Sequence, residues 1–243
     1  MAVPSMHVLA AKQPVAGGFD PLSIAWHSAY WAEDPGWTNP GDGNAVTTWD
    51  DATANGRDVT QATGTKRPLY RASVAALNGQ PALEFDGTDD FLQTVSAFTV
   101  TSGTLTKVII YQYRSHPGGN RHAWSAMDSG SNRADMFRTS GAWAIYGSAA
   151  AGGGAIYITG VTPNNNAHLE VATFGASASI LIDGSSITTG SGASALTTHC
   201  FGGYLGNENG AVTIAFAGML VGTLTTGEKA DLLAWAQDHY GTP

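Results

Sequence analysis

The chain has 243 residues and a mass of 25.1 kDa, which fits either one large domain or two small ones, since sandwiches and barrels often reach about 200–250 residues as a single unit. Charged residues make up only 12% of the chain, about half of the usual ~25%, and the net charge of −8 argues against a protein that binds the phosphate backbone of nucleic acids. The single Cys200 excludes an intramolecular disulfide framework, and no apolar stretch reaches the about 20 residues that a membrane helix needs.

The first segment, Met1–Asp20, has no hydrophobic periodicity and carries Pro4, Pro14 and a Gly17-Gly18 pair. These features predict an arm or linker rather than part of a core. The following residues, 21–243, are expected to form one domain.

Short apolar runs alternate with turn signals from Leu22 onward, at the spacing of about 8–12 residues that is typical of sandwiches and barrels. The clearest runs are Ile24–Tyr30, Ala82–Phe85, Leu105–Tyr113, Ala155–Thr159, Leu169–Phe174, Ser179–Ile182 and Val212–Leu220. In Val108–Tyr111 both the odd-numbered and the even-numbered residues are apolar, which predicts a central strand covered on both faces. Four pairs that tolerate positive φ separate these runs and predict tight turns: Asn78-Gly79, Asp86-Gly87, Asp183-Gly184 and Asn209-Gly210.

The end of the chain carries the signals of one helix. Thr225 and Glu228 have the spacing of a capping box, and Gly241 supplies a C-cap. We therefore expect a helix over about 226–240. The fold class expected from these patterns is all-β: two antiparallel sheets packed as a sandwich, with one short C-terminal helix.

Several segments of this sequence resemble the laminin-G-like, concanavalin-A-like jelly-roll family. They are Val46–Asp51, Asn55–Asp58, Arg67–Tyr70, Asn78–Leu92, His168–Phe174, Ile180–Gly184, Phe201–Gly206, Phe216–Gly218 and the closing Leu232–Gly241. The glycine-rich, charge-poor style and the ending Leu-Ala-Trp-Ala-x-x-His-Tyr-Gly are also similar to the jelly-roll minor tail proteins of phages that infect actinobacteria. This second resemblance implies a virion protein, made in the host cytoplasm and placed in the tail.

One motif suggests an enzymatic alternative. Glu84, Asp86 and Asp89 resemble the Glu-x-Asp-x-x-Glu motif of jelly-roll endoglucanases, in which two carboxylates on one strand face hydrolyse a glycosidic bond. The third acid is Asp rather than Glu, and Gly87-Thr88 interrupts the strand. The competing interpretation is that the two aspartates cap a turn through their own backbone.

A second acidic group could bind Ca²⁺, which takes six to eight hard oxygen ligands. It consists of Asp50, Asp51, Asn55 and Asp58. Its spacing is not that of an EF-hand loop, and turn capping is the simpler interpretation. No other cofactor is expected.

The middle of the chain combines aromatic and cationic residues. Four of the seven arginines lie between Arg114 and Arg138. Flat aromatic faces and planar donors are what sugar binding requires, so the candidate ligand-binding residues are Trp124, Arg133, Arg138, Trp143 and Tyr146. The alternative is that these aromatic side chains belong to the core of the sandwich.

The function expected from these observations is a non-enzymatic structural and recognition protein of a virion, with a phage tail tip as the first candidate location and host glycans as possible ligands. Its expected partners are other virion proteins, further copies of itself and a cell-surface polysaccharide, with no nucleic acid and no membrane insertion. A glycan-cleaving hydrolase and a capsid decoration protein with the same fold are the alternatives.

Overall fold

The structure is a computed structural model. It describes residues 18–94, 98, 100, 103–115, 118–127, 133–139, 142–148, 154–158, 164–175, 178–188, 196, 198–204 and 208–243. Most of the expected N-terminal arm, residues 1–17, lies outside this range.

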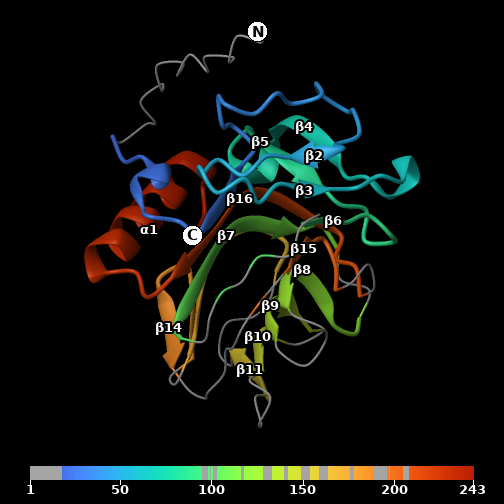
Figure 1. The fold of residues 1–243 in the computed structure, drawn as a ribbon. Coiled ribbons are helices and arrows are strands. Elements are labelled where there is room, and N and C mark those ends of the chain that lie inside the picture. Colours follow the sequence, from blue (N-terminus) through green and yellow to red (C-terminus); the bar gives the residue numbers. More distant parts are fainter. Residues whose placement is uncertain are drawn as a thin grey trace, which may run out of the picture.

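The described residues form two antiparallel sheets of eight strands each, as the sequence predicts (Figure 1). In the first sheet the strands follow one another in the order β14-β13-β12-β7-β16-β5-β4, and β1 also pairs with β16. Their bounds are β1 Ser28–Trp31, β4 Leu69–Val74, β5 Gln80–Glu84, β7 Leu105–Tyr113, β12 Ala167–Phe174, β13 Ser179–Ile182, β14 Ser185–Thr188 and β16 Val212–Val221.

The second sheet has the order β11-β10-β9-β8-β15-β6-β3-β2. Its strands are β2 Thr48–Trp49, β3 Val59–Thr60, β6 Leu92–Thr94, β8 Arg121–Met127, β9 Arg133–Arg138, β10 Trp143–Ser148, β11 Gly154–Ile158 and β15 Thr198–Phe201. Three short 3₁₀ turns, Pro21–Ser23, Gly64–Lys66 and Ala75–Leu77, complete the described connections.

Strand β7 confirms the expected central position. It pairs with β12 on one side and with β16 on the other, and eight of its nine side chains are buried. Ile109 and Tyr111 belong to the core between the sheets, whereas Val108 and Ile110 belong to a second core on the outer face of the first sheet. Alternate side chains of β7 therefore belong to two separate hydrophobic cores.

Helix α1, Thr226–Tyr240, covers that outer face (Figure 1). The capping box is present, because Thr225 accepts from the Glu228 amide while the Glu228 side chain accepts from the Thr225 amide. Trp235 packs edge-on against Phe216 of β16 at 5.4 Å between ring centroids. No helix among the described residues has the length and apolar character needed to cross a membrane.

The expected turns differ in their geometry. Asp183 and Gly184 both have positive φ and join β13 to β14, as predicted for a two-residue hairpin. At Asn209-Gly210 the positive φ is found one residue earlier, at Glu208. Gly210 is instead needed for close approach, since a Cβ there would lie 2.9 Å from the carbonyl oxygen of His122.

At Gly87, which follows β5, a positive φ and a close approach of neighbouring backbone occur together. Its φ is +81°, and a Cβ would lie 2.6 Å from the backbone nitrogen of Ala211, just before β16. Gly56 has a similar φ of +63°, but a Cβ there would meet nothing within 4 Å.

We predict that Gly56→Ala lowers the free energy of unfolding by about 1–2 kcal/mol, the usual cost of a left-handed conformation for a residue with a Cβ. Gly87→Ala should cost at least ~2 kcal/mol more, because the backbone of Ala211 must also move. Urea denaturation of both variants measures the difference. Equal losses would show that the turn and β16 are not in tight contact.

Candidate functional site

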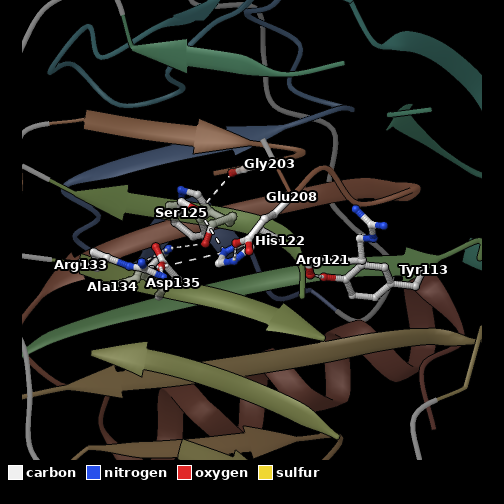
Figure 2. Close-up of polar contacts among 11 residues, drawn as sticks. Tyr113, Arg121, His122, Ser125, Arg133, Ala134, Asp135, Gly203 and Glu208 are labelled. Atoms are coloured by element: carbon white, nitrogen blue, oxygen red, sulfur yellow. Dashed lines mark hydrogen bonds and ion pairs between the residues drawn. The ribbon is translucent and has the colours of Figure 1, made fainter. Parts of the chain in front are cut away.

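An arginine and an aspartate mark the outer face of the second sheet. Arg133 and Asp135 alternate on β9 with Ala134 and Met136, whose side chains lie in the core between the sheets. Nε of Arg133 donates to Oδ2 of Asp135 at 2.7 Å, and Nη2 lies 2.7 Å from the same oxygen (Figure 2). The carboxylate is fully buried, so this pair fixes the guanidinium on the sheet.

Two tyrosines cover the faces of that guanidinium. The Cζ atom of Arg133 lies 4.3 Å from the ring centroid of Tyr146 on β10 and 4.3 Å from that of Tyr204. Arg133 keeps 22% of its side chain exposed, and both tyrosines are half-buried. The result is a planar donor held between two aromatic rings, with an edge open to solvent.

A histidine lies beside this pair (Figure 2). Nδ1 of His122 lies 3.2 Å from the Ser125 hydroxyl and 4.0 Å from Oδ2 of Asp135, and Nε2 lies 3.0 Å from Oε2 of Glu208. Burial, followed by the charges of Arg133 and Lys107, lowers the pKa of His122 to about 3. The ring is therefore neutral at pH 7.

The His122 group contains the residue types of a serine hydrolase, a hydroxyl, an imidazole and a carboxylate, but not their accessibility. Ser125 is fully buried and His122 is only 1% exposed. The Ser125 hydroxyl also lies 3.0 Å from the Gly203 carbonyl oxygen, which can only accept a hydrogen bond. In this arrangement no substrate can reach the hydroxyl, and the group serves to hold the outer face together.

The charge on Asp135 depends on the core behind it. Burial raises the pKa of Asp135 to about 6, and the charges of Arg133 and Lys107 oppose that rise. Lys107 reaches across from β7 and donates to the carbonyl oxygens of Trp124 and Ala134 at 3.0 and 2.8 Å. The Asp135 carboxyl group is thus half protonated near pH 6, and the ion pair forms more completely as the pH rises above that value.

The structure separates the predicted ligand-binding residues. Trp124 and Trp143 have no exposed surface and pack in the core between the sheets, which is the alternative that the sequence left open. Arg138 is 8% exposed, lies over the ring of Trp143 at 5.4 Å and donates to the Asn164 carbonyl. Arg133 and Tyr146 remain together at the surface, where a ligand-binding role stays a prediction.

The predicted catalytic motif is also divided. Arg71 donates to both oxygens of Glu84 at 3.0 and 3.2 Å, and this pairing lowers the pKa of Glu84. Asp86 lies beyond the end of β5, where its Oδ1 accepts from the amides of Thr88, Asp89 and Asp90. Asp86 therefore caps a turn, as the competing interpretation requires.

Asp90 brings a carboxyl group to this turn that the sequence motif does not include. Ligand oxygens of Asp86, Asp89 and Asp90 lie within 4.8 Å of one another, close enough to share a cation. Oδ2 of Asp90 accepts from the Asp86 amide. Burial, together with the neighbouring charges of Asp86 and Asp89, raises the pKa of Asp90 to about 6.

This raised pKa predicts a pH-dependent contribution to stability. Asp90 holds its proton more tightly in the folded chain, so its stabilising effect is full below about pH 4 and is lost as the pH rises through about 6. Asp90→Asn removes the titration and keeps an oxygen for the Asp86 amide. The free energy of unfolding of the variant, relative to wild type, should rise by about 2–3 kcal/mol between pH 4 and pH 7 in urea titrations.

Asp238→Asn on the exposed side of α1 is the control for that titration, since it removes the same charge without the burial. A difference between Asp90→Asn and wild type that stays constant with pH would contradict the assignment.

The predicted calcium ligands are mostly engaged by the backbone. The two oxygens of Asp51 accept from the amides of Ala29, Thr53 and Arg57 and from the Thr53 hydroxyl. Asp58 accepts from the Asp51 amide, and Asn55 donates to the carbonyl oxygen of His27. The Asp50 side chain, by contrast, makes no hydrogen bond with any residue that the structure describes. Calcium binding stays a prediction.

The candidate ligand-binding residues chosen from the sequence did not include Tyr204, His122 and Glu208, which lie around Arg133 and Asp135 in the structure. Glu208 comes seven residues after the end of β15, and Tyr204 comes directly after the Gly202-Gly203 pair. Only their positions in space link them to β9. The alternation of Arg133 and Asp135 on one strand face was the signal that could have added Asp135.

Comparisons with known proteins show the fold. No protein-family model and no curated protein matches the chain. Among solved structures, the chain is similar to a Trypanosoma rangeli sialidase in complex with sialic acid, with a TM-score of 0.59 and 16% identity over 89% of this chain. It is also similar to the ligand-binding domain of botulinum neurotoxin serotype D in complex with N-acetylneuraminic acid, with a TM-score of 0.61 and 11% identity over 92% of this chain.

A third similar structure is the binding domain of botulinum neurotoxin serotype G, with a TM-score of 0.58 and 12% identity over 82% of this chain. The chain spans 33% of the sialidase and 56% and 54% of the two neurotoxin domains. At these identities the similarity establishes a shared β sandwich. Functions of the larger proteins bear on this chain only as proposals.

Proposed function

We propose that this chain is a non-enzymatic glycan-recognition module that binds sugars at the Arg133 site, defined as Arg133, Asp135, Tyr146 and Tyr204. The observation that carries the proposal is the guanidinium held between two tyrosine rings and anchored by a buried carboxylate. A donor fixed in this way loses little side-chain entropy when it binds a pair of sugar hydroxyls.

The surroundings of the site favour sugars over other ligands. The carboxylate of Asp135 offsets the charge of Arg133, so the site does not select a strongly anionic partner. Aromatic rings contact the C–H surfaces of a sugar, and the tyrosine hydroxyls add donors and acceptors. Two of the similar structures are complexes with sialic acid or N-acetylneuraminic acid. These ligands are acidic sugars, and they support sugars in general, rather than an acidic one, as the class of ligand.

The sequence resemblance to minor tail proteins suggests the biological setting. We propose that the module belongs to a virion, in the tail, where several copies would present the Arg133 site to a polysaccharide on the host surface. Mass spectrometry of purified particles tests this part separately. Absence of the chain from particles would remove the virion setting without affecting sugar binding.

The runner-up function is a glycan hydrolase, and the turn after β5 favours it in one respect. Hydrogen bonds from backbone amides lower the pKa of Asp86 despite its partial burial, while the pKa of Asp90 is raised to about 6, and carboxyl groups with separated pKa values are typical of acid–base pairs. Against it, the oxygens of both residues accept backbone hydrogen bonds that hold the turn. Release of reducing sugar that Asp90→Asn abolishes would favour this function.

A glycan array of bacterial and host polysaccharides tests the recognition function. Wild type should bind at least one glycan, and Tyr146→Ala and Arg133→Lys should each weaken that binding by tenfold or more, because the first removes a ring and the second the planar fork. Lys229→Met is the control, since it removes a positive charge on α1, far from the site in sequence and in the other layer.

Both site variants leave Asp135 in place, and circular dichroism checks that they fold. If folded wild type binds no glycan, or if the two site variants bind as well as Lys229→Met, the Arg133 site is not a sugar-binding site.

A further inference from the structure

A small cavity lies at the opposite edge of the second sheet, away from β9 and β10. Its volume is about 260 Å³, and it lies beside β2, the last strand of that sheet. The lining residues come from the segment that leads into β2, from the strand itself and from the residue just after it. Thr38, Pro40, Ala45 and Thr47 are exposed, so the cavity opens to solvent.

The apolar side of the cavity is rigid. Trp37 is buried, and its Nε1 donates to the carbonyl oxygen of Thr48 at 3.0 Å. Its ring also packs against Tyr70 and Trp49, with centroids 5.7 and 6.4 Å away. The indole nitrogen is therefore already engaged, and Trp37 offers only its ring to a ligand.

The polar side of the cavity has unused hydrogen-bonding capacity. Thr38, Thr47, Thr48 and Asp50 line it, and none of these four side chains makes a hydrogen bond with the part of the chain that the structure describes. The contrast with the next residue is direct, because Asp51 accepts four hydrogen bonds from its own turn and from β1. The Asp50 side chain holds no such turn by hydrogen bonds to the described residues.

Charge narrows the class of ligand. Burial, followed by the nearby carboxylates of Asp58 and Asp34, raises the pKa of Asp50, so two further acidic groups lie near this position. No lysine or arginine is among the described residues that line the cavity. An acidic ligand would be repelled, whereas a ligand rich in uncharged hydroxyl groups can donate to a carboxylate and exchange hydrogen bonds with threonines.

We propose that this cavity, defined by Trp37, Ala45, Thr47 and Asp50, is a second binding site that takes one uncharged sugar ring. The volume is slightly below the ~300–1,000 Å³ of sites for drug-sized ligands, which suits a single monosaccharide unit. Asp50 accepts hydrogen bonds from two neighbouring hydroxyls, and the ring of Trp37 meets the C–H surface. The site is separate from the Arg133 site and does not depend on it.

Ligand-detected NMR and calorimetry on the full chain test this proposal with methyl glycosides of glucose, galactose and mannose at millimolar concentrations. At least one should bind. Asp50→Asn should weaken it about tenfold, the usual effect of losing a charged hydrogen-bond acceptor. Ala45→Phe should abolish binding by filling the exposed wall of the cavity.

Two comparisons distinguish binding in this cavity from binding elsewhere on the chain. Asp238→Asn, the same substitution on the exposed side of α1, should leave the affinity unchanged. Glucuronate should bind at least tenfold more weakly than methyl glucoside. The proposal would be overturned if no neutral glycoside binds, or if Asp50→Asn or Ala45→Phe binds the glycoside as well as wild type does.

Discussion

Lys107 joins the two sheets through an amino group that has no access to water. Its side chain is fully buried on β7, and its ammonium group donates to two carbonyl oxygens on β8 and β9 of the opposite sheet while lying 4.0 Å from the centroid of the Trp124 ring. A buried ammonium is costly unless it is hydrogen-bonded in this way. Burial lowers the pKa of Lys107 to about 7, and Asp135 and Glu170 oppose that change.

The Arg133 site depends on this contact because of the alternation of side chains along a strand. Ala134 gives its carbonyl oxygen to Lys107, and the residues on either side of it, Arg133 and Asp135, point to the outer face. The hydrogen bond from Lys107 fixes β9 at Ala134, and it therefore also fixes the position of the Arg133–Asp135 ion pair on the outer face. On the neighbouring strand β8, the carbonyl oxygen of Trp124 accepts from Lys107 in the same way, directly before Ser125 in the sequence.

Periodicity and turn chemistry were sufficient to predict the fold. Apolar residues at both parities indicated that β7 is central, the capping box at Thr225 indicated where α1 begins, and Asp183-Gly184 indicated a hairpin. These signals are local, so one sequence is enough to detect them. The two-sheet sandwich follows from them, because each strand must bury one face.

The sites could be predicted only in part, since they depend on contacts between distant segments. Composition drew attention to Arg133 and Tyr146, but it could not show that Trp124 and Trp143 are buried or that Tyr204 completes the site. Likewise, Asp50 and Asp51 are adjacent and identical in type. Only the hydrogen bonds of the folded chain reveal that Asp51 holds a turn while Asp50 lines a cavity.

NMR chemical-shift mapping with a glycan that binds the chain tests the central claim most directly. Sugar recognition at the Arg133 site predicts that the Nε–H signal of Arg133 and the backbone amides of Tyr146 and Tyr204 shift as the glycan saturates the protein. A glycan that binds the Ala45→Phe variant, whose cavity beside β2 is filled, and leaves these three signals unchanged would contradict it.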